Sequence, residues 1–134
     1  MLTIEKRLLR PERQRQVPPQ FSWIDHRLIR HQHLRACEPA AWALYLVTVT
    51  VADAQGLSYY SDAALCRMLH LEPAQLVQAR QQLLAADVLA YEKPLYQVLA
   101  LPEPQPVAVA ERRANQPLSV GQILQRILSS GGAA

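Results

Sequence analysis

Four glutamines lie close together in the middle of the sequence, at Gln75, Gln78, Gln81 and Gln82. On a helical wheel that places Leu76 in the core, all four fall on the opposite face of the helix. A glutamine amide can hydrogen-bond the major-groove edge of adenine, so Gln75, Gln78 and Gln82 are predicted to face the bases if this helix enters a groove of duplex DNA. The alternative is that the glutamines only give this helix a neutral, soluble surface.

Positive charge is concentrated near the N-terminus and not around these glutamines. Residues 1–35 contain eight Lys and Arg against three Asp and Glu, a balance of +5, whereas residues 36–101 have a balance of −3. Because phosphate contacts release counterions and give affinity without sequence preference, residues 1–20 are predicted to be a flexible basic arm that clamps DNA. Its predicted contacts are Arg10, Arg13 and Arg15. The alternative is a solvated terminus that contacts nothing.

No catalytic or metal-binding pattern competes with this interpretation. The spacing of His31, His33 and Cys37 matches no standard four-ligand zinc site, so neither a metal nor another cofactor is predicted. The tyrosines, serine and aspartate at positions 59–62 lack the basic cluster that would stabilise a reacting phosphate. No enzymatic activity is therefore expected.

Composition indicates a single domain with flexible ends. No apolar run approaches the roughly 20 residues of a membrane helix, and the basic start lacks the features of a leader peptide. Cys37 and Cys66 provide no disulfide framework. A cytoplasmic protein without a membrane partner is expected.

The elements expected to position the glutamines begin with a helix that starts at Pro39 and ends before Gly56. Residues 47–51 alternate like a strand, but about a dozen uncharged residues after a proline fit a buried helix better. Its buried side is expected to carry Trp42, Tyr45, Leu46 and Val49.

A helix–turn–helix unit is predicted next. Residues 57–60 should form a short strand, and Ser61 should cap a helix from Asp62 to Leu69. His70 sits at the turn, where a left-handed backbone is expected. The first helix is expected to bury Leu65, Met68 and Leu69.

The second helix is predicted from Pro73 to about Ala86, followed by a turn at Asp87. The expected core residues are Leu76, Ala79, Leu83 and Leu84. Arg80 lies about 40° from Leu76 on the helical wheel, so it is expected to follow the core edge and miss phosphate.

A small hairpin should follow, with strands over residues 88–92 and 95–101 joined across Lys93-Pro94. The sequence leaves open whether that peptide bond is cis.

The two flanks of this unit have their own patterns. Ser22 and Asp25 are predicted to cap a short helix that buries Trp23, Ile24, Leu28 and Ile29.

Prolines indicate a stiff linker over residues 102–118, and a capping pattern at Ser119 predicts an amphipathic helix over residues 119–130. Its apolar face contains Ile123, Leu124, Ile127 and Leu128. This helix is expected either to fold back or to bind a second copy or another protein.

The run Ser-Asp-Ala-Ala-Leu-Cys-Arg-Met-Leu-His-Leu-Glu-Pro-Ala-Gln-Leu at residues 61–76, followed by Leu-Leu-Ala-Ala-Asp-Val-Leu-Ala-Tyr at 83–91, resembles bacterial winged helix-turn-helix DNA-binding domains. Such domains occur in transcription regulators, replication initiators and small proteins of mobile elements. The resemblance covers residues 21–101 loosely and the middle third more strictly.

The resemblance implies a mainly α fold with a small β-hairpin wing (α+β), in which the helix from Pro73 enters a major groove and the Lys93 hairpin lies near the backbone. Arg67 and Lys93 are accordingly predicted to contact the DNA backbone. The expected function is non-enzymatic binding of duplex DNA, as a regulator or as an accessory protein of replication or a mobile element. The alternative is a protein–protein adaptor that uses the uncharged helix face and the C-terminal helix.

Overall fold

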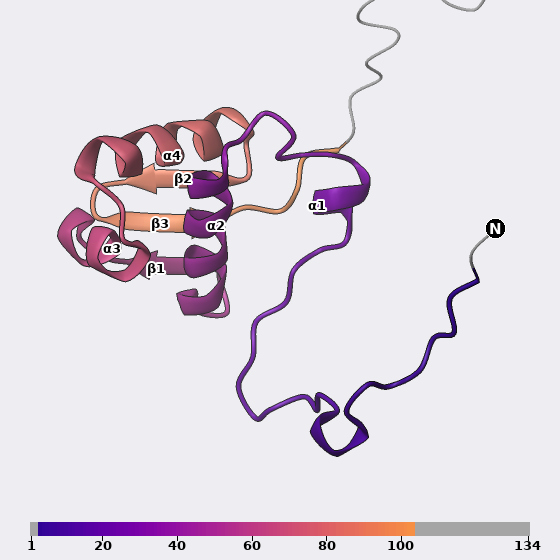
Figure 1. Cartoon of the computed structure of the whole chain (residues 1–134). Coiled ribbons are helices and arrows are strands. Elements are labelled where there is room, and N and C mark those ends of the chain that lie inside the picture. The colour runs from indigo at the N-terminus through magenta and orange to yellow at the C-terminus, as the bar shows by residue number, and fades with distance from the viewer. Residues whose placement is uncertain (1–2, 104–134) are drawn as a thin grey trace, which may run out of the picture. The chain divides into compact units, whose positions relative to one another are not determined.

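The computed structural model describes residues 3–103 and shows an α+β arrangement of short helices and one small sheet (Figure 1). The elements in chain order are the 3-10 helix η1 (Pro11–Arg13), α1 (Arg27–Arg30), α2 (Pro39–Val51), β1 (Leu57–Tyr59), α3 (Asp62–Leu69), α4 (Pro73–Ala85), β2 (Leu89–Glu92) and β3 (Leu95–Val98). The predicted C-terminal helix, with Ile123, Leu124, Ile127 and Leu128, lies outside the described residues, as does most of the predicted linker.

The uncharged stretch after Pro39 is a helix and not a strand, as its length indicated. Its buried face is made by Ala41, Leu44, Tyr45, Thr48 and Val49. The prediction that Leu46 is buried was wrong, since 54% of this residue is exposed. Leu46 lies about 200° around the helix from the fully buried Leu44, and so it points away from the core.

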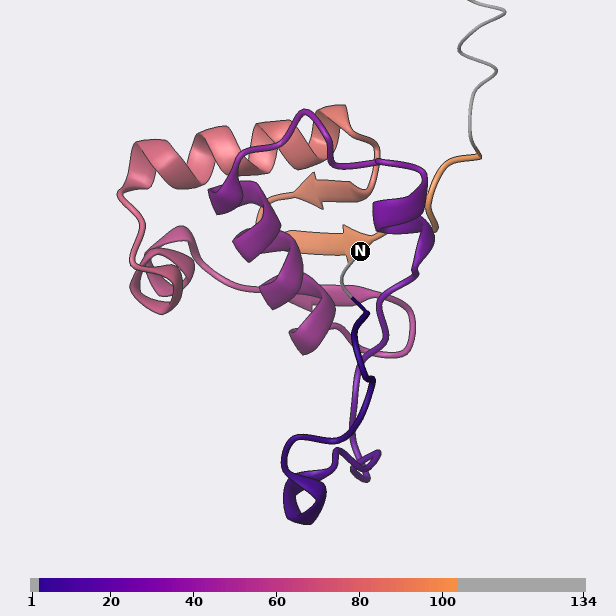
Figure 2. The same cartoon turned by 45° about the vertical axis from the view of Figure 1, so that its right-hand side comes forward.

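The three strands form an antiparallel sheet in the order β1-β3-β2. Helix α4 lies next to β2, and α2 lies over β3 (Figures 1 and 2). Ser58 pairs with Tyr96, and Tyr96 pairs with Tyr91, so these three side chains form one row across the sheet. Ser58 and Tyr96 are buried, which identifies the face of the sheet that packs against the helices. The predicted hairpin is present, although both strands are shorter than expected, and the Lys93-Pro94 peptide bond is cis.

Local chemistry sets the limits of helices α3 and α4. The Ser61 hydroxyl accepts a hydrogen bond from the backbone N–H of Ala64 at 3.1 Å, which caps α3 as predicted. His70 ends α3 in the left-handed conformation with φ 58°, and Asp87 follows α4 with φ 62°. Both turn predictions are therefore confirmed.

Two of the core residues predicted for α3 and α4 lie partly in solvent and not in the core. Leu65 and Leu83 are buried, but Met68 is 45% exposed and Leu84 is 38% exposed. A helix that packs on one side buries one stripe of side chains, and Met68 and Leu84 lie at the edge of that stripe. Leu69 is half-buried.

The helix predicted to start at Ser22 begins later, at Arg27. The Asp25 carboxylate accepts a hydrogen bond from the backbone N–H of Arg27 at 2.8 Å, while the Ser22 hydroxyl donates to the carbonyl of Thr50 in α2. Because the helix has a single turn, it presents only Leu28 to the core. The prediction that Trp23, Ile24 and Ile29 are buried was wrong, since these residues are 75%, 46% and 63% exposed.

Replacing Gly56 by alanine is expected to lower the free energy of unfolding by about 2 kcal/mol. Gly56 has φ +86°, and an added Cβ would lie 2.8 Å from the carbonyl oxygen of Val98 in the paired strand. Urea unfolding measures the effect, and the matched control is Gln55→Ala at the exposed neighbouring position, which should change stability by less than about 0.5 kcal/mol. Equal stabilities of the two variants would contradict this expectation.

Candidate nucleic-acid interface

The three glutamines predicted to face DNA differ in what their side chains do. Gln75 accepts a hydrogen bond from the backbone N–H of Glu72 through Oε1 at 2.8 Å, as part of the capping box of α4. Gln82 is half-buried, and its Oε1 accepts from the backbone N–H of Glu38 at 2.7 Å. Gln78 and Gln81 are exposed on α4. Gln75 and Gln82 on this face therefore also make hydrogen bonds that stabilise the fold.

The capping role of Gln75 was readable in the sequence. A helix start that carries an acidic residue three positions before Gln is a variant of the capping-box pattern, and Glu72 and Gln75 have this spacing. The contact of Gln82 with Glu38 was not readable, because it joins residues 44 positions apart in the chain.

Arg80 is buried, which agrees with the expectation that it follows the core edge. Its Nη1 donates to Asp62 Oδ1 at 2.9 Å and to the Tyr96 hydroxyl at 2.7 Å. The guanidinium carbon lies 4.3 Å from the centre of the Tyr91 ring, a cation–π distance. Arg80 thus joins α3, α4 and both strands of the hairpin.

The charge state of this cluster follows from its surroundings. Burial opposes the charged form of Arg80, but the hydrogen bonds to Asp62 and Tyr96 outweigh this effect and raise the pKa of the guanidinium. Burial also raises the pKa of the Tyr96 hydroxyl, so Tyr96 stays neutral and can accept the hydrogen bond from Arg80. Arg80 is therefore always charged, and its guanidinium contacts other residues of the protein.

The two side chains of the folded part that are predicted to contact the DNA backbone lie on the surface. Arg67 is exposed in the last turn of α3, and Lys93 is exposed at the tip of the β2–β3 hairpin. With Arg80 committed to Asp62, these two are the remaining cationic side chains of residues 36–103. The charge available for phosphate on this part of the chain is small.

The basic arm, residues 1–20, carries five exposed cationic side chains, against two in residues 36–103. Arg10, Arg13 and Arg15 are all exposed, around the single turn of η1. Arg10 is paired with Glu12 at 2.9 Å, but both side chains are mostly solvated, so the pair is weak. A phosphate can therefore compete for Arg10 at little cost.

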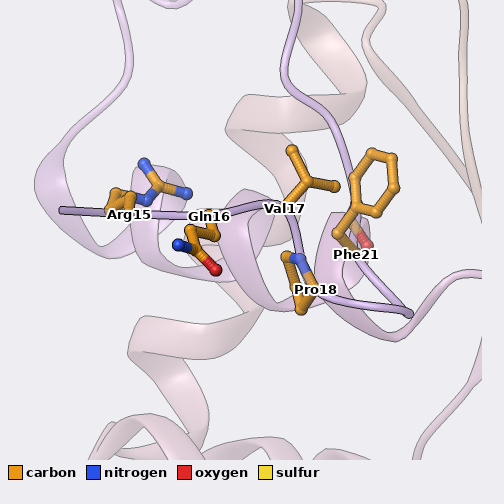
Figure 3. Close-up of a pocket in the computed structure, with 6 residues that line it drawn as sticks. Arg15, Gln16, Val17, Pro18 and Phe21 are labelled. Atoms are coloured by element: carbon orange, nitrogen blue, oxygen red, sulfur yellow. The ribbon is translucent and has the colours of Figure 1, made fainter.

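A shallow hollow lies at the C-terminal end of the basic arm. It is lined by Arg15, Gln16, Val17, Pro18, Phe21 and Ser22 (Figure 3). Phe21 in this lining and the nearby Trp23 are 64% and 75% exposed. Sequence reasoning missed this aromatic surface because apolar side chains at a helix start are usually buried.

In residues 3–103, no group of three or more His, Cys, Asp or Glu side chains could hold a metal ion. None of the helices in the same part of the chain is long and apolar enough to cross a membrane.

Neither a scan against models of protein families nor searches of curated proteins and of solved structures found a match to this chain.

Proposed function

We propose that this protein is a non-enzymatic, winged-helix DNA-binding protein that grips duplex DNA with α4 and the basic arm. The observation that carries the proposal is the order of the elements. Helices α2, α3 and α4 are followed directly by the β2–β3 hairpin, and β1 completes the sheet. A three-helix core with a hairpin wing is the arrangement that the sequence resemblance implies. A role in regulation, replication or a mobile element would follow from such binding.

Base reading is assigned mainly to Gln78. Pairing with adenine uses both the oxygen and the nitrogen of a glutamine amide. The Oε1 atoms of Gln75 and Gln82 already accept backbone hydrogen bonds, whereas Gln78 is exposed on the same helix. Gln75 and Gln82 can still donate through their amide nitrogens. Replacing Gln78 should therefore relax the sequence preference more than it lowers the overall affinity.

Most of the affinity for DNA phosphates is assigned to the arm, and Arg67 and Lys93 are additional contacts to the DNA backbone. Residues 36–101 have a charge balance of −3, and their buried cation is held by Asp62. Affinity for a phosphate backbone requires cations that can leave water for phosphate. The exposed arginines at positions 10, 13 and 15 meet this requirement.

Binding of the intact chain to duplex DNA should weaken steeply as salt rises. Replacing Arg10, Arg13 and Arg15 together by glutamine should reduce the slope of log K against log salt by about 2 to 3, since each lost phosphate contact removes about 0.9. The affinity at low salt should fall by at least about tenfold. Fluorescence anisotropy of a labelled duplex at several salt concentrations measures both quantities.

The matched control removes the same number of charges from the C-terminal tail, as Arg112→Gln, Arg113→Gln and Arg126→Gln. This variant should keep the slope of the intact chain. Equal losses in both triple variants would refute the arm as a specific clamp. Absence of duplex binding by the intact chain at low salt would refute the proposal, and a partner complex lost on Ile127→Glu would then favour the adaptor alternative.

A further inference from the structure

Two large aromatic side chains next to the basic arm are exposed to solvent. Phe21 is 64% exposed and Trp23 is 75% exposed. Between them, the Ser22 hydroxyl donates to the carbonyl of Thr50 at 3.3 Å, which ties this segment to the end of α2. The aromatic pair is therefore held next to the folded part of the chain and yet does not pack into its core.

The charge around the pair is strongly positive. Residues 13–37 contain five arginines and a single acidic residue, Asp25. Asp25 is ion-paired with Arg27 at 2.7 Å, and the hydrogen bonds from Arg27 hold the pKa of this carboxyl at about 2. Asp25 thus stays ionised and paired with Arg27. Arg13, Arg15 and Arg30 are exposed along the same segment.

The hollow at Phe21 also combines an aromatic surface with positive charge. The polar Arg15 and Gln16 and the apolar Val17, Pro18 and Phe21 all line it, and Figure 3 shows the polar side chains at the left of the view and the apolar ones at the right. An apolar wall with an aromatic ring suits the flat face of a base. A guanidinium suits phosphate, which it can contact through two parallel N–H groups.

We infer that residues 13–30 bind single-stranded nucleic acid, with Phe21 and Trp23 stacking on bases and with Arg13, Arg15 and Arg30 contacting phosphates. A single strand is favoured over a duplex because bases can stack on protein rings only when they are unpaired. This inference rests on the proposed function for the nucleic-acid class of the partner. It adds a second mode of binding, in which the arm holds an unpaired strand.

The test uses the full-length chain and a labelled 20-nucleotide oligothymidine, with anisotropy as the readout. Phe21→Ala and Trp23→Ala should each lower the affinity for the oligothymidine by about tenfold, because one stacked base is lost. Trp23→Phe keeps an aromatic face and should stay within about twofold of the parent. The affinity of all three variants for a duplex should stay within about twofold.

The matched control is Tyr59→Ala, which removes an aromatic residue that is 74% exposed and lies outside residues 13–30. A loss in Trp23→Ala no larger than in Tyr59→Ala would overturn the inference. So would a parallel loss of oligothymidine and duplex binding, or tighter binding of the intact chain to anionic phospholipid vesicles than to oligothymidine. Oligothymidine binding without duplex binding would instead refute only the proposed duplex function. Urea unfolding checks that the variants remain folded.

Discussion

Replacing Arg80 by alanine is expected to lower the free energy of unfolding by about 3 kcal/mol. Arg80 is 9% exposed, and its guanidinium contacts Asp62, Tyr96 and Tyr91. Its removal leaves the buried Tyr96 hydroxyl without this donor and opens space between α4 and the hairpin. The Asp62 side chain is 48% exposed, so its charge remains partly solvated and the loss stays near the lower end of the range for buried pairs.

Two further variants separate the causes of this loss. Arg80→Met keeps most of the packing of the side-chain stem and should recover part of the stability. Arg67→Ala removes an exposed arginine from α3 and should change the free energy of unfolding by less than about 0.5 kcal/mol. Urea unfolding of each variant gives these values. If Arg80→Ala and Arg67→Ala were equally stable, the contacts of Arg80 would have no energetic role.

The second large effect is expected at Leu83. This residue is 0% exposed in α4, which packs against α2. Leu83→Ala should lower the free energy of unfolding by about 3 kcal/mol, because it loses the burial of the removed carbons and leaves a cavity. The midpoint of urea unfolding should fall accordingly, while its slope stays the same.

The neighbouring Leu84 provides a control with the same chemistry. It is 38% exposed, so Leu84→Ala should cost less than about 1 kcal/mol. The sequence pattern places both leucines near the core, and the packing of α4 fully buries only Leu83. Similar losses in the two variants would contradict the orientation of α4 in the structure.

The limits of the elements were largely determined by the sequence itself. A serine cap at Ser61, a left-handed turn at His70, a proline at Pro73 and a turn at Asp87 depend on hydrogen bonds and backbone angles within a few residues. Such effects act between neighbours in the chain, so the residue types alone predict them. The choice of helix over strand after Pro39 was also local, because length decided it.

The partners of individual side chains were decided by the tertiary structure. Arg80 reaches Asp62 and Tyr96 across 18 and 16 residues, and Gln82 reaches Glu38 across 44. A helical wheel placed Arg80 at the core edge, but it could not show which side chains from other elements would meet it there.

The tertiary structure also decided which apolar side chains are exposed. Trp23, Leu46 and Leu84 look like core residues in the sequence, and all three are substantially exposed. Burial depends on which face of an element meets another element, and that face is selected by the packing of the whole chain. Local pattern therefore determined where the helices and strands form, and tertiary packing determined which of their side chains remain on the surface for binding.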